Sequence, residues 1–206
     1  MELRDALSQI AEIRQQMARA QVFRGYRAAT AAFSAASALL AGAVQPYIAS
    51  DPQRHPKAYV LLWAGVALLN LLAVAVEMTV RYRRSQSQLH RDTTLAAAEH
   101  FIPAVVAGAT VTLVLWSFAP TTLWMLPGLW CILFSMGIFA SRRMLPAATV
   151  YVAMFYLLAG LVNLAVAQGS NAFSPLAMGL PFGLGQILAA VVLYWNLERR
   201  NASDES

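Results

Sequence analysis

The chain has 206 residues, of which 59% are apolar and 12% are charged, with a formal net charge of +5 at pH 7. Soluble globular domains average roughly 45–50% apolar and about 25% charged residues, so the composition excludes an ordinary soluble domain. A single cysteine, Cys131, excludes a disulfide framework and a multi-thiolate metal site within the chain. The arginines adjoin apolar runs and form no basic stripe with aromatic residues, so we expect no nucleic acid as a partner.

Residues 1–27 are too polar to span a bilayer, but their apolar side chains are periodic. The stripe includes Leu3, Ile10, Ile13 and Met17. Spacings of three and four residues predict an amphipathic helix. Up to residue 20 this segment carries three arginines and three acids, so it gains little from an anionic lipid surface. We therefore expect it to bind a protein partner or a second copy of the chain. The alternative is that it folds back onto the protein's own cytoplasmic loops.

Six apolar runs follow, each close to the roughly 20 residues that a helix needs to cross the hydrocarbon core. They cover residues 28–48, 58–80, 99–118, 122–140, 144–167 and 175–196. The fourth is the weakest, because Pro127 interrupts its first half. The predicted fold class is all-α: a polytopic six-transmembrane-helix bundle with an N-terminal cytoplasmic amphipathic helix and a polar cytoplasmic tail over 197–206.

Basic residues set the expected orientation of the spans. Thirteen of the fifteen fall on the side of the two termini, and only Arg54 and Lys57 fall on the other. This bias predicts that both termini and the loops at 81–98 and 141–143 face the cytoplasm. Arginine outnumbers lysine fourteen to one and alanine is abundant, which indicates a GC-rich, bacterial coding sequence. We therefore predict a multi-pass protein of the bacterial inner membrane.

The 81–98 loop is the longest and the most highly charged. Asp92 is expected to cap a helix that begins at Thr93 and continues into the third span, because its side chain can accept from free backbone amides. The third helix would then project into the cytoplasm.

Polar side chains inside a span are expensive, so each one is a candidate functional position. The candidates are Asn70, Glu77, Glu99, His100, Asn163 and Gln186. Asn70 and Gln186 lie near the middle of spans two and six. Either residue can form an interhelical hydrogen bond, typically worth about 0.6–2 kcal/mol in a bilayer, or line a substrate or ion path. Asn163 lies toward the outer end of span five.

Glu77 follows Asn70 by two helical turns on the same face. Arg81 is one turn further on, so an ion pair at headgroup level explains this carboxylate. Glu99 and His100 open span three on the same side of the membrane and can join Glu77 in a cluster. Their spacing matches no metal-ligand pattern, and we predict neither a metal nor a cofactor.

Small residues recur every four positions in three spans, where they let helices approach closely. These faces are Thr30, Ser34, Ala38 and Gly42 in span one, Ala104, Gly108 and Thr112 in span three, and Gly179 and Gly183 in span six. They predict a compact bundle.

Two function classes fit the sequence. No nucleophile elbow, zincin, Walker or dinucleotide motif is present, which argues against an enzyme. The favoured class is an interaction, accessory or regulatory membrane subunit that engages a cytoplasmic partner through residues 1–27 and 81–98, because the spans lack an unpaired charge at mid-membrane. The alternative is a small, oligomeric transporter or channel that uses Asn70, Gln186 and Glu77.

The N-terminal stripe gives a first prediction. Replacing both Ile10 and Ile13 with aspartate places two charges in an apolar interface, where their desolvation costs several kcal/mol. The double variant should still insert its six spans but lose a partner, or a self-contact detected by crosslinking at Met17. Unchanged crosslinking together with unchanged partner recovery would show that this helix mediates no association.

Overall fold

The computed structural model describes residues 28–84, 88–142 and 145–198, so the predicted amphipathic helix over 1–27 and most of the polar tail lie outside the described residues. The described chain is helical and contains no strand. Its elements are α2 (Ala28–Ile48), α3 (Pro56–Arg84), α4 (Gln88–Phe118), the 3₁₀ helix η1 (Pro120–Met125), α5 (Leu126–Ala140), α6 (Thr149–Val166), the 3₁₀ turn η2 (Gly169–Asn171), α7 (Pro175–Leu193) and the π-helical turn η3 (Tyr194–Glu198). Within the described residues, six helical segments are long and apolar enough to cross a membrane, which confirms the all-α class and the expected number of long apolar helices.

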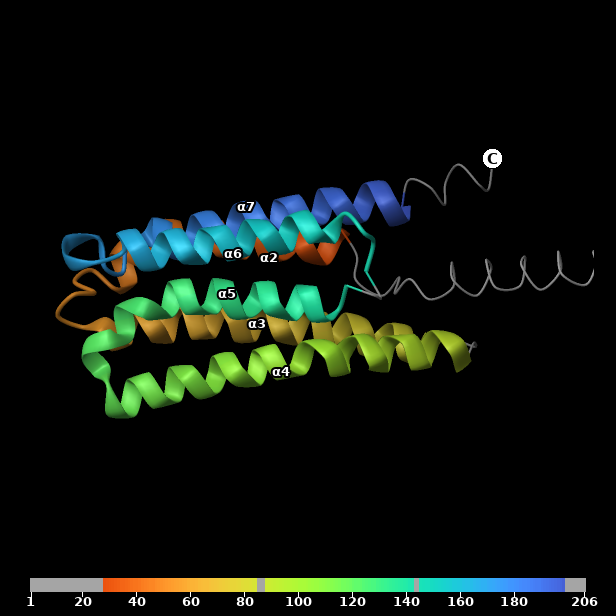
Figure 1. The fold of residues 1–206 in the computed structure, drawn as a ribbon, viewed down its shortest axis with the longest axis horizontal. Coiled ribbons are helices and arrows are strands. Elements are labelled where there is room, and N and C mark those ends of the chain that lie inside the picture. The colour runs from red at the N-terminus through yellow and green to blue at the C-terminus, as the bar shows by residue number, and fades with distance from the viewer. Residues whose placement is uncertain (1–27, 85–87, 143–144, 199–206) are drawn as a thin grey trace, which may run out of the picture.

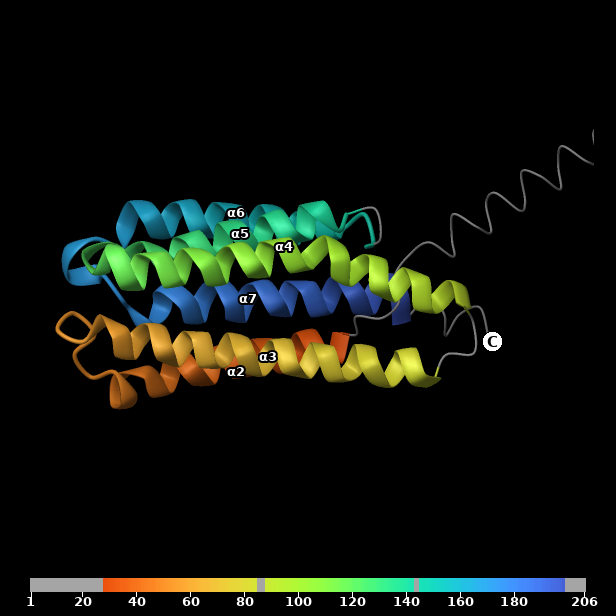
Figure 2. The same cartoon turned by 90° about the horizontal axis from the view of Figure 1, so that it is seen from below.

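The helices alternate in direction and form a ring in chain order, as Figures 1 and 2 show. Each helix packs on its neighbours in sequence, α7 closes the ring against α2, and α5 also contacts α7 across it. One end, here called the loop end, carries the connections 49–55, 119–125 and 167–174. The opposite end, here called the terminal end, holds the start of α2 and the end of α7 (Figure 1).

Glycines allow the closest helix approaches. A methyl group added at Gly42 of α2 would lie 3.4 Å from Cα of Gly179 on α7. Between α5 and α6 the fit is tighter, because a methyl group on Gly160 would lie 2.8 Å from the carbonyl oxygen of Gly128. The small-residue faces predicted for spans one and six are therefore confirmed as a packing surface, with Gly183 covered by Leu39.

The small-residue face of α4 packs on α5. A methyl group at Gly137 would lie 3.0 Å from Cβ of Ala104 and would overlap the ring of Phe101. About two helical turns away, nearer the loop end, the Trp130 indole N–H donates to Thr112 Oγ1 at 2.9 Å. The face predicted for span three is thus confirmed as well, and it determines how α4 sits on the ring.

Two buried clusters fill the bundle. The first lies toward the loop end and includes Tyr59, Trp63, Leu123, Leu126 and Phe173. The second surrounds Tyr156, whose ring contacts Phe134, Phe155 and Phe182 with centroids 4.7–5.7 Å apart. Such tilted and edge-on contacts are the favoured geometries of aromatic pairs. The second cluster joins α5, α6 and α7, whereas the first joins α2 and α3 to the loop end and to α7.

Large apolar side chains also cover the outside of the helices. They include Leu40, Leu61, Leu113, Leu161 and Leu184, each at least half exposed. Exposed aromatic side chains lie near the two ends. Tyr47 and Phe118 are 85% and 84% exposed near the loop end, and Tyr151, Tyr194 and Trp195 are at least half exposed near the terminal end.

Several helix boundaries differ from the expected ones. Helix α4 begins at Gln88, so the prediction that it starts at Thr93 with Asp92 as its cap is wrong. Residues 88–98 include leucine, alanine and glutamine, strong helix formers with no breaker among them, which explains the longer helix. In the fourth span a 3₁₀ segment comes first, and Pro127 lies in the first turn of α5, where its missing N–H costs no hydrogen bond.

The contact between α5 and α6 gives a second prediction. Gly160→Ala should destabilise the protein by about 1–3 kcal/mol, because the added methyl overlaps the Gly128 carbonyl and Ile132. Gly65→Ala is the matched control, since nothing lies within 4 Å of the added methyl and alanine favours a helix. Thermal unfolding in detergent should show a lower midpoint for the first variant alone. Equal midpoints would contradict the role assigned to this crossing.

Candidate functional site: a polar ladder between α2 and α3

Three hydrogen-bonded pairs join α2 to α3. Thr30 Oγ1 donates to Glu77 Oε2. Further along, Asn70 Nδ2 donates to Ser37 Oγ at 2.9 Å. Nearest the loop end, Trp63 Nε1 donates to Gln45 Oε1 at 3.0 Å. We call these six residues the α2–α3 polar ladder.

The spacing of the ladder follows from helix geometry. Its α3 members, Trp63, Asn70 and Glu77, are seven residues apart, which is nearly two turns and about 10 Å along the axis. The α2 members follow at intervals of seven and eight residues. Because the two helices are antiparallel, the first member on α2 meets the last on α3. The ladder therefore fixes the register of α2 against α3.

The layer at the loop end is fully buried and ties three segments together. Gln45 is 1% exposed, and its Nε2 donates to the Phe173 carbonyl oxygen at 2.8 Å. Phe173 precedes α7 and has a φ of 63°, a left-handed conformation that is uncommon outside glycine and asparagine. The Gln45 amide thus links α2, α3 and the segment before α7 through both of its polar atoms. The nearby Tyr59 hydroxyl is buried and has no hydrogen-bond partner among the described residues.

The other two layers are half-buried. Asn70 also donates to the Val66 carbonyl oxygen at 2.9 Å, so its amide is held by its own helix and by α2. Glu77 is the one ladder member with a carboxylate, and it lies one turn before the end of the apolar part of α3 at Val80. The side chain of Arg81 lies outside the described part of the structure, so the Glu77–Arg81 ion pair stays a prediction.

Asn163 and Gln186 lie away from the ladder and join α6 to α7. Asn163 Nδ2 donates to the Ala177 carbonyl oxygen at 2.6 Å. Gln186 Nε2 donates to the Tyr156 hydroxyl at 3.2 Å, within the aromatic cluster. Asn70 and Gln186 thus make the interhelical hydrogen bonds that the sequence offered as one of two interpretations, and Asn163 makes one that was not among the expectations. Whether any of them also serves transport stays open to experiment.

Glu99 and His100 are exposed on α4. Glu77, the third member of the cluster that the sequence suggested, accepts a hydrogen bond from Thr30. Thr30 belongs to α2, which neighbours α3 on the side of the ring opposite to α4. Within residues 28–84, 88–142 and 145–198, no three histidine, cysteine or acidic side chains lie close enough to hold a metal ion.

Four ladder members were not among the predicted site residues. Thr30 counted only as a small residue, and Ser37, Gln45 and Trp63 were not singled out. One signal was available in the sequence: polar or indole-bearing residues recur at nearly equal steps on two consecutive spans. The residues on the two spans match in pairs only when one span is read from its N-terminus and the other from its C-terminus, because the two helices are antiparallel.

Comparisons with known proteins give no relative for this chain. No protein-family model matches it, no curated protein matches it, and no solved structure matches it. The candidate function rests on the geometry of the helices.

The middle layer of the ladder gives a third prediction. In a double-mutant cycle, Ser37→Ala and Asn70→Ala should show a coupling energy of about 0.6–1.7 kcal/mol, between the average and the maximum measured for interhelical hydrogen bonds in a membrane protein. Ser37→Ala with Asn163→Ala is the control, because Asn163 bonds to α7 and should not couple. Unfolding free energies in mixed micelles provide the measurement. A coupling near zero for the first pair would contradict the ladder.

Proposed function

We propose that the six apolar helices cross a membrane, with the bilayer covering their outer surface. The supporting observation is the number of large apolar side chains that the bundle leaves exposed on all six helices. Soluble monomers rarely expose a contiguous apolar patch larger than a few hundred Å². A bilayer removes this surface from water, and helices satisfy their own backbone hydrogen bonds within it.

The exposed aromatic residues support this placement. Tyrosine and tryptophan favour the two membrane–water interfaces. Tyr47 lies near the loop end, while Tyr151, Tyr194 and Trp195 lie near the terminal end. Helix α7 (Pro175–Leu193) measures about 28 Å, close to the roughly 30 Å of a hydrocarbon core.

We place the terminal end in the cytoplasm of a bacterial cell, at its inner membrane. Thirteen of the fifteen basic residues belong to segments at this end, among them the exposed Arg83 and Arg142. At the loop end, Arg54 pairs with Asp51 at 3.3 Å and Lys57 lies 4.9 Å from the centre of the Trp116 ring. The positive-inside rule then puts both termini in the cytoplasm.

For this chain we favour the function of an interaction or regulatory subunit that engages a cytoplasmic protein. The observation that carries this proposal is the length of the α3–α4 hairpin. The apolar part of α3 ends at Val80 and that of α4 begins at Glu99, yet helix α4 starts at Gln88. Its first eleven residues therefore add about 16 Å of helix beyond the span. Figure 1 shows the hairpin reaching past the neighbouring helices at the terminal end.

The polar residues inside the bundle also fit this role. Asn70, Asn163 and Gln186 each hold one helix against another. Side chains that form hydrogen bonds between helices stabilise the bundle, which suits a protein that holds a docking surface in place. Helix α2 begins at the same end as the hairpin, and we propose that the predicted helix over 1–27, which precedes α2 in the sequence, contributes to the same docking surface or to a contact with a second copy of the chain.

A transporter or channel is the second candidate function, and the α2–α3 polar ladder is the observation that favours it. Its pairs follow one another from Glu77 near the terminal end to Gln45 near the loop end. In this second proposal an ion or solute crosses the membrane along the ladder. The half-buried Glu77 and Asn70 supply polar groups that it could contact on the way.

The partner-recovery assay described for the Ile10 and Ile13 variant extends to the hairpin. Arg83→Glu reverses an exposed charge on α3 beyond the span and should reduce partner recovery in mild detergent. Arg54→Glu, an exposed arginine at the loop end, should leave it unchanged. Equal recovery with both variants would remove the hairpin from the docking surface.

The fourth prediction tests the orientation. Reporter domains fused at Gln53 and Ser170 should be active outside the cytoplasm, and fusions at Ser87 and Ser206 should be active inside it. Both expectations follow from the distribution of arginine. A reversed signal at one of these four sites would refute the proposed topology.

The fifth prediction separates the two functions. Glu77→Gln keeps an oxygen acceptor for Thr30, so folding, insertion and partner recovery should be nearly unchanged. A transport path that needs the carboxylate would instead lose its flux in reconstituted vesicles. Loss of activity in a variant that unfolds at the wild-type temperature would favour the transporter.

A further inference from the structure

The packing of α3 changes along its length. At the loop end, Tyr59, Val60 and Trp63 are each at most 2% exposed. Among the residues beyond Trp63 whose side chains the structure describes, 64–80 and Arg83, none is buried. Helices α2 and α7, by contrast, have buried residues over nearly their whole length. The three buried residues, here called the foot of α3, are therefore the part of this helix that the bundle holds most firmly.

The ladder layer at the foot is costly to open. Trp63 Nε1 donates to Gln45 Oε1 at 3.0 Å, and the amide nitrogen of Gln45 donates to the Phe173 carbonyl oxygen. The Trp63 and Gln45 side chains are at most 2% exposed. A buried donor or acceptor that loses its partner costs its full desolvation penalty. Separation of α2 from α3 is therefore strongly opposed at this layer.

The middle layer is different, because each of its members also has a partner on its own helix. Asn70 Nδ2 donates to the Val66 carbonyl oxygen at 2.9 Å as well as to Ser37. Ser37 Oγ lies 2.9 Å from the Ser34 carbonyl oxygen, to which it can donate. If the two helices separate here, each side chain keeps a hydrogen bond. Opening this layer removes an interhelical interaction and leaves neither side chain without a partner.

The third layer lies where water is close. Thr30 Oγ1 donates to Glu77 Oε2, and both residues are half-buried. The apolar part of α3 ends at Val80, less than one turn beyond Glu77. In the proposed membrane placement this is the headgroup level, where water can solvate a carboxylate that has moved away from α2. The cost of separating α2 from α3 thus falls from the foot toward the terminal end.

The helix on the other side of α3 restrains it less. Helix α3 packs less extensively on α4 than on α2, and a methyl group added at Gly65 would have nothing within 4 Å. Helix α4 has its own attachment to α5, through Ala104 against Gly137 and through the Thr112–Trp130 hydrogen bond. The less densely packed side of α3 is therefore the one that faces α4.

We propose that α3 is a hinged arm that pivots on its foot. The two ladder layers nearest the terminal end open and close reversibly as α3 tilts toward α4, while the Gln45–Trp63 layer stays closed. Because α3 is one helix to Arg84, the tilt gives the hairpin at its end two positions. The inference deepens the docking function proposed for the hairpin and rests on it for its consequence. A partner that binds one position more tightly shifts the arm toward that position.

Distances between spin labels test the pivot. Val76 lies 13 residues beyond Trp63, which is about 20 Å along the axis, so a tilt of about 10° moves it by roughly 3–4 Å. Two label pairs join α3 to α7 at opposite ends of the bundle, in a Cys131→Ala background. They are Val76→Cys with Tyr194→Cys near the terminal end, and Leu61→Cys with Leu176→Cys near the loop end. These four side chains are at least half exposed, so the labels stay outside the core.

Double electron–electron resonance in detergent micelles should give two distances for the terminal-end pair and one for the loop-end pair. The longer of the two belongs to the tilted arm, because α7 neighbours α2 in the ring. Ser37→Ala removes the middle layer and should raise the ratio of the longer to the shorter distance about 3- to 20-fold. This factor corresponds to the coupling expected for one interhelical hydrogen bond. Adding Thr30→Val should raise the ratio further.

Thr79→Val is the matched control on the same helix. Thr79 is exposed, and its hydroxyl donates to the Ala75 carbonyl oxygen of α3 itself, so this variant should leave the ratio unchanged. A single unchanged distance in the wild type, in Ser37→Ala and in the variant with Thr30→Val would show that α3 is fixed and would overturn the proposal. An equal shift in the loop-end pair would also overturn it, since α3 would then move as a whole.

The measurement needs no partner, so the pivot and the docking function can fail separately. Fixed label distances would remove the pivot and leave docking by the hairpin in place. Unchanged partner recovery with Arg83→Glu would remove the hairpin from docking, while two label distances would still establish the pivot.

Discussion

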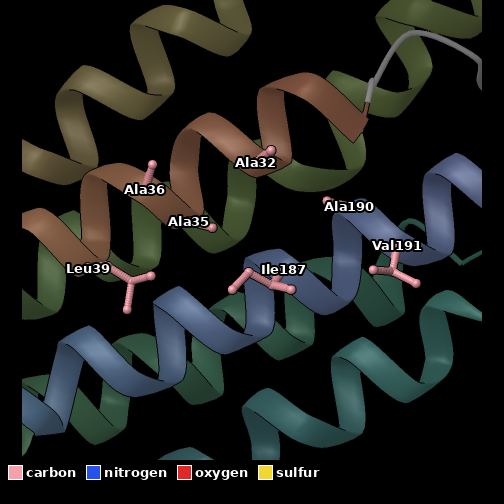
Figure 3. A pocket seen from close by; sticks show the side chains of 7 residues that line it. All are labelled: Ala32, Ala35, Ala36, Leu39, Ile187, Ala190 and Val191. Carbon is pink, nitrogen blue, oxygen red and sulfur yellow. The ribbon is translucent and has the colours of Figure 1, made fainter.

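Close contact between helix backbones at glycines holds this bundle together. In a bilayer, lipid chains are as apolar as leucine, so burying a side chain from lipid gives little hydrophobic driving force and dense packing matters more. Gly42 meets Gly179 at the α2–α7 crossing, and Gly128 meets Gly160 at the α5–α6 crossing. Nearer the terminal end, residues 32–39 of α2 and 187–191 of α7 line an apolar groove on the outside of the bundle (Figure 3).

Helix α3 is attached in a different way. Its Gly65 faces open space, and many of its large side chains, including Leu61, Leu68 and Leu72, are exposed. The polar ladder is what links α3 to α2 along most of their shared length. Because hydrogen bonds depend on alignment, this interface specifies register more than it contributes dispersion energy. A helix held in this way can carry a projecting hairpin without being packed tightly along its length.

Sequence reasoning predicted the local features of the fold and missed those that depend on register. The six long apolar helices, the small-residue faces and the polar positions were visible, because each reflects composition or periodicity within one helix. The partners of Asn70, Asn163 and Gln186 were not, since a side chain's neighbour on another helix depends on how the two are aligned. Gln45 was missed because a span end is ordinarily solvated, whereas here the Phe173 segment covers it.

The order of helices around the ring bears on how the protein is assembled. Nearly all the contacting helices are neighbours in sequence, so they can pair as successive hairpins while the chain is being synthesised, with little loop-closure entropy. The contact between α2 and α7 is different, because it joins the first described helix to the last. It forms only after α7 has arrived. Until then the small-residue face of α2 lacks its partner, and we expect the open ring to be the intermediate most exposed to chaperones and membrane proteases.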